Sequence, residues 1–172
     1  MAQVGVTPDR VEPAEIDESP FKCELPRVLA ARLAQAKADA VAARFPDAVV
    51  LAADTVVACG RRILDKPADA AEARKTLKLL SGRRHRVYGG ICVAAGAMRR
   101  SRVVVTQVQF KRLEAAEIDA YIESAEWQGK AGAYAIQGRA GAFVVKINGS
   151  YSNVVGLALY ETLALLEGVR VA

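Results

Sequence analysis

The chain has 172 residues, of which 52% are hydrophobic and 25% charged, and its formal net charge is +5. This length suits one domain with a sizeable core, and the composition is that of an ordinary soluble globular protein. The longest apolar runs are broken by Asp54, Gly60 or Gly96, so no segment is expected to span a bilayer. No secretory signal is visible, and the three cysteines lack CxxC spacing. We therefore expect a cytoplasmic protein with reduced thiols and neither a disulfide framework nor a zinc site.

Basic residues cluster at 83–86 and 99–102. Nucleic acid is one partner that such clusters can bind. Aromatic residues make up only 6% of the chain and do not interleave with the basic ones. We therefore expect solvated turns between strands, with phosphate-bearing small molecules as an alternative, and no nucleic-acid polymer as partner. His85, which lies between arginines, is expected at the surface.

The first 24 residues carry no strong periodicity, and a helix is predicted over 25–44. Pro26 suits the first turn of a helix, where its missing N–H costs nothing. Apolar side chains recur along this segment at helical spacing. Lys37 lies beside the apolar stripe, and a lysine on a mostly alanine helix is by itself usually solvated.

The stretch 48–55, with the sequence AVVLAADT, predicts the central strand. An unbroken apolar run rich in Val and Leu is typical of a strand buried on both faces of an α/β sheet. Asp54 is then expected at the end of this strand, where ligand crevices of open α/β sheets lie. An aspartate there can bind a metal or take a proton from water. Alternatively it caps the next turn, and this stretch alone leaves both interpretations open.

After Asp54 the pattern alternates between strands and helices. Lys66 stands before Pro67 and is therefore pushed to an extended conformation between a strand and a helix, which suits phosphate binding. Most lysines in such loops are nevertheless only surface charge. The predicted elements are a short strand at 63–64, a helix at 69–80 capped by Asp69 and stopped by Gly82, antiparallel strands at 86–95 and 101–110, a helix at 114–124, a strand at 143–147 and a helix at 154–167.

The segment 126–141 has the composition of a binding site. It contains four glycines, which allow the backbone to approach a ligand closely. Between them stand Glu126, Lys130, Tyr134 and Gln137. A flexible linker is instead rich in serine and poor in large side chains. We therefore interpret Glu126, Lys130 and Tyr134 as substrate-binding residues.

Carboxylates and lysines at predicted loop and strand ends suit metal-assisted phosphoryl chemistry. Acids can hold Mg²⁺ or orient water, and lysines neutralise phosphate oxygens. The chain shows no Walker motif, no GxGxxG and no Ser-His-Asp pattern. The polar residues concerned are Glu18, Lys37, Asp54, Lys66, Glu126, Lys130 and Gln137.

Six motifs follow one another along nearly the whole chain: Glu15-Ile-Asp-Glu-Ser, Ala53-Asp-Thr-Val-Val, Lys66-Pro67, Leu80-Ser-Gly-x-x-His85, Lys130-Ala-Gly-Ala-Tyr-Ala-Ile-Gln-Gly138 and Ile147-Asn-Gly-Ser-Tyr-Ser-Asn-Val-Val-Gly-Leu157. This set resembles the Maf family of nucleoside triphosphate pyrophosphatases, which are related in fold to the inosine triphosphatases. The resemblance implies an α/β fold, with a two-lobed, twisted, mixed β-sheet flanked by helices and a substrate cleft between the lobes. It also implies a homodimer and a divalent cation, Mg²⁺ or Mn²⁺.

The resemblance further implies hydrolysis of a nucleoside triphosphate to the monophosphate and pyrophosphate. Asp54 matches the proposed general base, and with Glu18 it is expected to hold the metal. Lys37 and Lys66 match catalytic positions near the metal and phosphates. Two further positions track the base: Thr55 and Gln137 resemble the branch acting on dTTP and UTP, whereas the branch acting on 7-methyl-GTP typically has Gln and Glu there.

Two departures from the family pattern stand out. Ala158 replaces the usual Pro, and the front Ser-x-Ser-Pro-Arg-Arg loop, whose serine and arginines grip phosphate, is absent. The chain is therefore expected to be a single Maf-like domain over 1–172 that is incomplete at its N-terminus, because of a start assigned too far downstream or a natural truncation. Poor turnover is expected in either case. The alternative is a catalytically impaired nucleotide-binding regulator linked to septum formation, and a general nucleic-acid-binding module ranks third.

Overall fold

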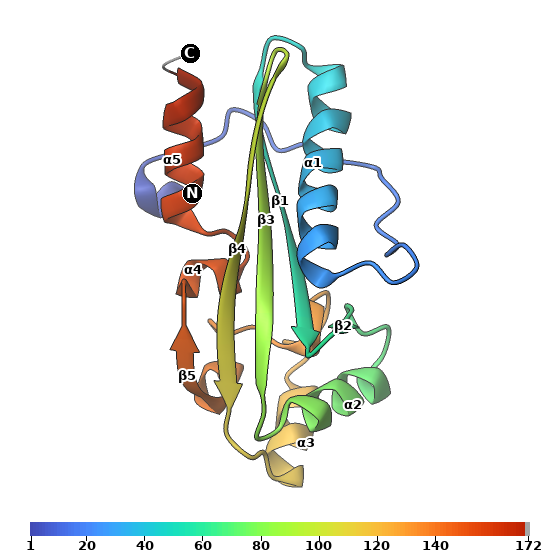
Figure 1. Ribbon diagram of the computed structural model, residues 1–172. Helices are drawn as coiled ribbons and strands as arrows, with labels where there is room; N and C mark the ends of the chain where they lie inside the picture. Colours follow the sequence, from blue (N-terminus) through green and yellow to red (C-terminus); the bar gives the residue numbers. More distant parts are fainter. Residues whose placement is uncertain (171–172) are drawn as a thin grey trace.

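A five-stranded antiparallel sheet forms the centre of the computed structural model, which describes residues 1–170 (Figure 1). The strand order is β2-β1-β3-β4-β5. The strands are β1 (Val49–Cys59), β2 (Arg62–Leu64), β3 (Arg84–Ala95), β4 (Met98–Phe110) and β5 (Val144–Asn148).

The expected α/β class is confirmed, but the strands of the described chain pair only antiparallel, so the expected mixture of strand directions is not found there. Short connections explain part of this result. Gly60 and Gly96, both with positive φ, turn β1 into β2 and β3 into β4 within two residues. Such tight turns join only antiparallel strands, whereas parallel neighbours need a long crossover.

Helices cover both faces of the sheet (Figure 1). The helix α1 packs on β1 and β3, while α4 and α5 pack on β3 and β4 from the other side, and α2 and α3 lie together at the lower end. The helices are η1 (Ala2–Val4), α1 (Pro26–Arg44), α2 (Ala70–Leu80), α3 (Ala115–Glu123), η2 (Ala131–Ala133), η3 (Arg139–Phe143), α4 (Tyr151–Val155) and α5 (Leu159–Arg170). None of those within residues 1–170 has both the length and the apolarity needed to cross a bilayer.

Buried side chains form two regions that correspond to the expected lobes. One lies beneath α1, where small side chains such as Ala34 and Cys92 let the helix approach the sheet. A larger region gathers where α2, α3 and the turns after residue 130 meet the lower part of the sheet. Its larger members are Leu77, Leu80, Phe110, Tyr121, Trp127, Tyr134 and Phe143.

Two predicted element ends differ from the structure. The central strand continues to Cys59, so Asp54 lies within β1 and not at its end. The residues after Asp54 are Thr, Val and Val, whose branched side chains suit a strand, and the aspartate itself is accommodated because its side chain meets Lys37. The last predicted helix is divided into α4 and α5, because Gly156 adopts a φ of 136° that ends the first of them.

Gly90 lies where α1 packs closely on the sheet. A Cβ atom built there would lie 2.0 Å from the carbonyl oxygen of Ala30, which is a backbone atom of the helix. Gly90→Ala is therefore expected to lower the free energy of unfolding by about 3 kcal/mol or more, since helix and sheet must separate. Chemical denaturation measures this change.

Gly168→Ala is the matched control, because only the flexible side chain of Arg100 lies near that position. It is expected to change the unfolding free energy by less than about 1 kcal/mol. Equal effects of the two substitutions would contradict the proposed close packing at Gly90.

Candidate active site

Three charged side chains from distant parts of the chain meet beside the middle of β1. Lys37 on α1 places its Nζ 2.6 Å from Asp54 Oδ1 on β1 and 2.6 Å from Glu18 Oε1 in the segment before α1. The Asp54 and Lys37 side chains are only 10% and 18% exposed, so their interaction is largely shielded from water. One ammonium thus bridges two carboxylates.

The charges of this cluster stabilise one another. Burial alone lowers the pKa of Lys37, but its hydrogen bonds to Asp54 and Glu18 outweigh this effect, so the pKa is raised. The hydrogen bond from Lys37 lowers the pKa of Glu18. Lys37 is therefore protonated and Glu18 ionised near neutral pH. Lys66 lies at the rim, with its Nζ 3.6 Å from Glu18 Oε2 and its side chain 59% exposed, so it is free to move toward an anion.

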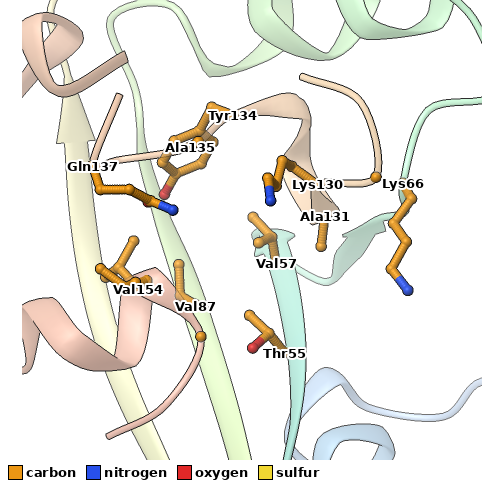
Figure 2. Close-up of a pocket in the computed structure, with 13 residues that line it drawn as sticks. Thr55, Val57, Lys66, Val87, Lys130, Ala131, Tyr134, Ala135, Gln137 and Val154 are labelled. Carbon is orange, nitrogen blue, oxygen red and sulfur yellow. The ribbon is translucent and has the colours of Figure 1, made fainter. Parts of the chain in front are cut away.

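A cavity of about 260 Å³ opens on the other face of β1 (Figure 2). In this view Gln137 and Lys66 lie at opposite sides, while Thr55 and Lys130 point into the space between them. The cavity therefore combines an amide, a hydroxyl and two ammonium groups with apolar walls. Its apolar lining includes Val57, Val87, Ala131, Tyr134, Ala135, Val154 and Val155.

A second cavity, of about 220 Å³, lies on the α1 side of the sheet and is lined by the carboxylates Glu18 and Asp54. Thr55, Val57 and Lys66 line both cavities, so the two form one cleft.

The open edge of β1 explains how this cleft reaches both faces of the sheet. Over 49–56, β1 pairs only with β3 among the described residues, and β2 joins its other edge from Val57 onward. Because successive side chains in a strand alternate between faces, Asp54 points toward α1 and Thr55 toward the larger cavity. The cleft thus passes around the unpaired edge, with the carboxylates Glu18 and Asp54 on one side and Gln137 on the other.

The structure brings most of the predicted site residues to this cleft. Lys37 holds the two carboxylates of the smaller cavity, and Tyr134, Lys130 and Gln137 line the larger one. Glu126 is the exception, since it lines neither cavity.

Glu126 instead fixes the turn after Gln137. Its Oε2 accepts a hydrogen bond from the backbone N–H of Arg139 at 2.8 Å, and a Cβ on Gly138 would lie 2.1 Å from the same atom. Its contacts support a role in shaping the loop that carries Gln137.

His85 is buried, so the prediction of a surface histidine is wrong. It is 1% exposed, its Nε2 lies 2.8 Å from the hydroxyl of Tyr134, and its ring packs edge-on against Phe110. Because side chains alternate between the two faces of β3, Arg84 and Arg86 face solvent and His85 between them faces inward. Burial lowers the pKa of His85 to about 4, so the ring is neutral at pH 7.

The contact with His85 also defines what Tyr134 contributes. Tyr134 is 6% exposed, and burial raises the pKa of its hydroxyl. Because that hydroxyl is paired with His85, Tyr134 contributes chiefly its ring to the cavity wall.

The apolar wall of the larger cavity was not assigned to the site from the sequence. Val87 comes from β3, and Val154 and Val155 come from α4. The only available signal for the α4 residues was the motif at 147–157, because isolated valines carry no functional pattern.

The donor set fits a divalent cation that is completed by substrate. Among residues 1–170 no group of three or more His, Cys, Asp and Glu side chains is arranged to hold a metal. Glu18 and Asp54 nevertheless converge on one positive charge, the Lys37 ammonium. Mg²⁺ is commonly bound by one or two carboxylates together with substrate phosphates and water, and Glu18 and Asp54 are the residues that would supply such carboxylates here.

A single antiparallel sheet flanked by helices, with a charged cleft around one open strand edge, defines an α/β protein with a candidate small-molecule site. Sequence comparison gives the particular group. The chain belongs to the Maf family, because the family model described as "Maf-like protein" matches residues 1–169.

Relatives in three bacteria carry the name dTTP/UTP pyrophosphatase. The protein of Paramagnetospirillum magneticum is 61% identical over 170 residues, which cover 98% of this chain and 89% of that protein. The protein of Sphingopyxis alaskensis is 59% identical, with 99% and 90% covered, and that of Caulobacter vibrioides is 56% identical, with 98% and 88% covered.

Proposed function

We propose that this chain is a nucleoside triphosphate pyrophosphatase that hydrolyses dTTP and UTP to the monophosphate and pyrophosphate. The observation that carries the proposal is the single cleft around β1, with the carboxylate–lysine cluster at one end and Gln137 at the other. The names of the relatives support the same activity. Triphosphate would lie at the charged end and the base in the larger cavity.

In the proposed reaction, water attacks the α-phosphorus, and the bond from that phosphorus to the bridging oxygen breaks. Pyrophosphate leaves with the bridging oxygen, and the proton from water passes to a carboxylate oxygen of Asp54. Lys37 remains protonated and stabilises negative charge near Asp54. Lys66, which is exposed and near Glu18, can neutralise phosphate oxygens as they arrive.

The proposal includes a divalent cation, Mg²⁺ or Mn²⁺, held by Glu18 and Asp54. When bound, it would supply charge neutralisation at the phosphates. A homodimer, which the family resemblance implies, and a cytoplasmic location, which the expected reduced thiols favour, are also part of the proposal. Sedimentation analysis tests the oligomeric state directly.

Base choice is expected to depend on the larger cavity. The Gln137 amide offers one acceptor and two N–H donors, which match the imide N–H and carbonyls of a pyrimidine. At about 260 Å³ the cavity lies just below the usual range of ligand sites, about 300–1,000 Å³, which favours a single ring. We expect kcat/KM for dTTP and UTP to exceed that for ATP, GTP and 7-methyl-GTP by about 100-fold.

Pyrophosphate release, measured side by side with the five nucleotides, checks this expectation. Gln137→Glu should reduce kcat/KM for dTTP and UTP, because a carboxylate repels the base carbonyls. Gln128→Glu, at an exposed position on the same loop, is the matched control and should leave the preference unchanged. A purine preference would reject the proposed specificity. Nucleotide binding without pyrophosphate release would instead favour the regulator.

A further inference from the structure

Glu18 belongs to a segment that has no helix or strand to hold it. Residues 11–25 form neither kind of element, so the path of this part of the chain depends on individual contacts. Further back, Arg44 donates to the carbonyl of Pro13 at 2.8 Å, and Ile16 packs against the cluster beneath α1. Closer to Glu18, three hydrogen bonds converge on one residue, Arg32.

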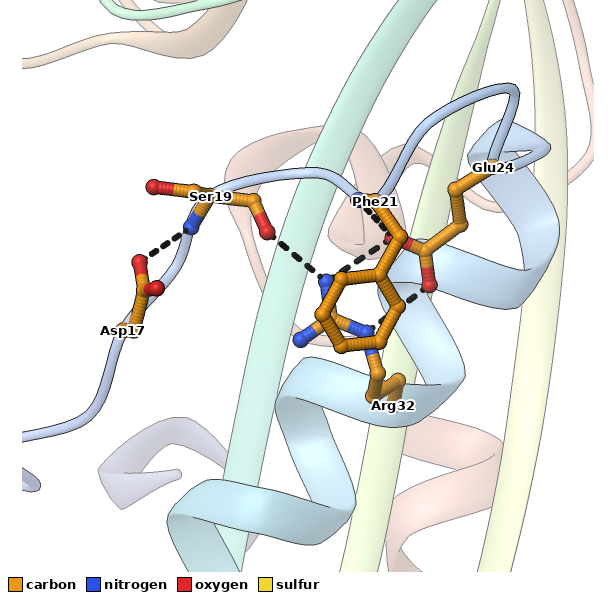
Figure 3. Close-up of polar contacts among 5 residues, drawn as sticks. All are labelled: Asp17, Ser19, Phe21, Glu24 and Arg32. Carbon is orange, nitrogen blue, oxygen red and sulfur yellow. Dashed lines mark hydrogen bonds and ion pairs between the residues drawn. The ribbon is translucent and has the colours of Figure 1, made fainter.

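Arg32 on α1 binds the segment 17–24 at three points (Figure 3). Its Nε and Nη2 each donate to Glu24 at 2.8 Å, forming a bidentate pair. Nη2 also donates to the backbone carbonyl of Ser19 at 3.0 Å. The guanidinium carbon lies 4.0 Å from the centre of the Phe21 ring, which covers one face of the group.

The segment is also organised around this anchor by its own hydrogen bonds. The Glu24 carboxylate accepts from the backbone N–H of Phe21 at 2.9 Å, and Asp17 accepts from that of Ser19 at 2.9 Å. The Glu24 side chain is 5% exposed, so it depends on Arg32 as its charge partner. With its fork already occupied by Glu24 and Ser19, Arg32 is an anchor and not a spare phosphate ligand.

We propose that Arg32 is a positioning residue, which fixes the backbone of Ser19 so that the neighbouring Glu18 carboxylate meets Lys37 and Lys66. Arg32 and Lys37 lie on one helix, so α1 holds the segment at the Ser19 carbonyl and at the Glu18 side chain together. A small shift of Ser19 would carry the Glu18 carboxylate away from Lys37, the residue that it shares with Asp54. The functional consequence rests on the proposed pyrophosphatase activity, whereas the anchoring does not.

The first test is a double-mutant cycle on pyrophosphate release from dTTP. Arg32→Gln is expected to lower kcat/KM about 30-fold, and Arg32→Lys less, since lysine keeps the charge but not the bidentate fork. In a Glu18→Gln background, Arg32→Gln should lower kcat/KM further by less than about threefold, because its effect passes through Glu18. Arg27→Gln, exposed on the same helix, is the control and should retain full activity. If the fold-reductions in kcat/KM caused by the Arg32 and Glu18 substitutions multiplied in the double variant, the proposal would be overturned.

The second test needs no turnover. Lys22 is exposed within the segment, so native-state trypsin cleavage between Lys22 and Cys23 reports how firmly the segment is held. Cleavage is expected to be about tenfold faster in Arg32→Gln and unchanged in Arg27→Gln. An unchanged rate in Arg32→Gln would overturn the anchoring. If the wild-type chain released no pyrophosphate, the proposed function would fail, and the cleavage rates would still decide whether Arg32 holds the segment.

Discussion

Asp54→Asn is expected to lower kcat for dTTP hydrolysis about 100-fold or more, with little change in melting temperature. Asparagine preserves the shape of the side chain but cannot accept the proton from water. Lys37 keeps its second carboxylate partner, Glu18, so the cluster retains one ion pair. Steady-state kinetics and thermal denaturation of the same preparation separate the two effects.

Asp47→Asn is the matched control, since Asp47 is exposed in the turn before β1. It should leave both kcat and melting temperature unchanged. Near-normal turnover in Asp54→Asn would move the role of proton acceptor to Glu18, the other carboxylate in contact with Lys37. A large fall in melting temperature would instead assign Asp54 mainly to the stability of the cluster.

Elements with local chemical signals could be predicted from the sequence. Asp69 caps α2 by accepting the backbone N–H of Glu72 at 2.8 Å, as its position predicted. Gly82, with a φ of 70°, follows the end of that helix, and Gly96 turns β3 into β4. In each case the residue type and its own backbone conformation carry the information. No contact from a distant segment is needed.

The end of β1 could not be predicted in this way. A buried apolar run followed by a carboxylate was interpreted as a strand that stops, but the strand continues through Asp54 to Cys59. The carboxylate is tolerated there because the ammonium of Lys37, on a different element, neutralises it. That partner is supplied by packing of α1 on the sheet, which a local pattern does not contain.

The same limitation explains the wrong prediction for His85. The surface position was predicted from the charges of the neighbouring arginines, whereas strand alternation places His85 inside, against Tyr134 and Phe110. Glu126 shows the reverse case, because a polar residue in a glycine-rich segment suggested ligand contact but in the structure holds the backbone of Arg139. Residue type alone did not separate a group that faces the cleft from one that shapes it.

The open edge of β1 gives adjacent residues separate tasks in the proposed site. Asp54 and Thr55 are neighbours in sequence but face opposite sides of the sheet, and both reach the cleft because no strand covers this edge within the described chain. In the proposed site, charge chemistry and base selection would therefore be set by different surroundings. Substitutions in the Lys37 cluster should change kcat for every nucleotide, whereas substitutions at Gln137 should change the ranking of nucleotides.

Lys37→Met is expected to have opposite effects on two proposed functions of Glu18 and Asp54, the binding of a cation and the hydrolysis of nucleotide. The Lys37 ammonium lies 2.6 Å from both Glu18 and Asp54, in the position that a shared cation would compete for. Removing it should strengthen Mn²⁺ binding in the absence of nucleotide about tenfold, because the metal no longer displaces a positive charge. The same change should lower kcat/KM for dTTP about 100-fold, since charged hydrogen bonds contribute roughly 1.5–3 kcal/mol.

Calorimetric titration with Mn²⁺ measures the first effect, and the rise in melting temperature on adding Mn²⁺ should be larger in Lys37→Met than in the wild type. Lys75→Met, exposed on α2, is the matched control for loss of one positive charge. Unchanged or weaker Mn²⁺ binding in Lys37→Met would show that Glu18 and Asp54 do not hold the cation together. Unchanged kcat/KM would remove Lys37 from the reaction, and Lys66 would then remain as the lysine nearest to Glu18.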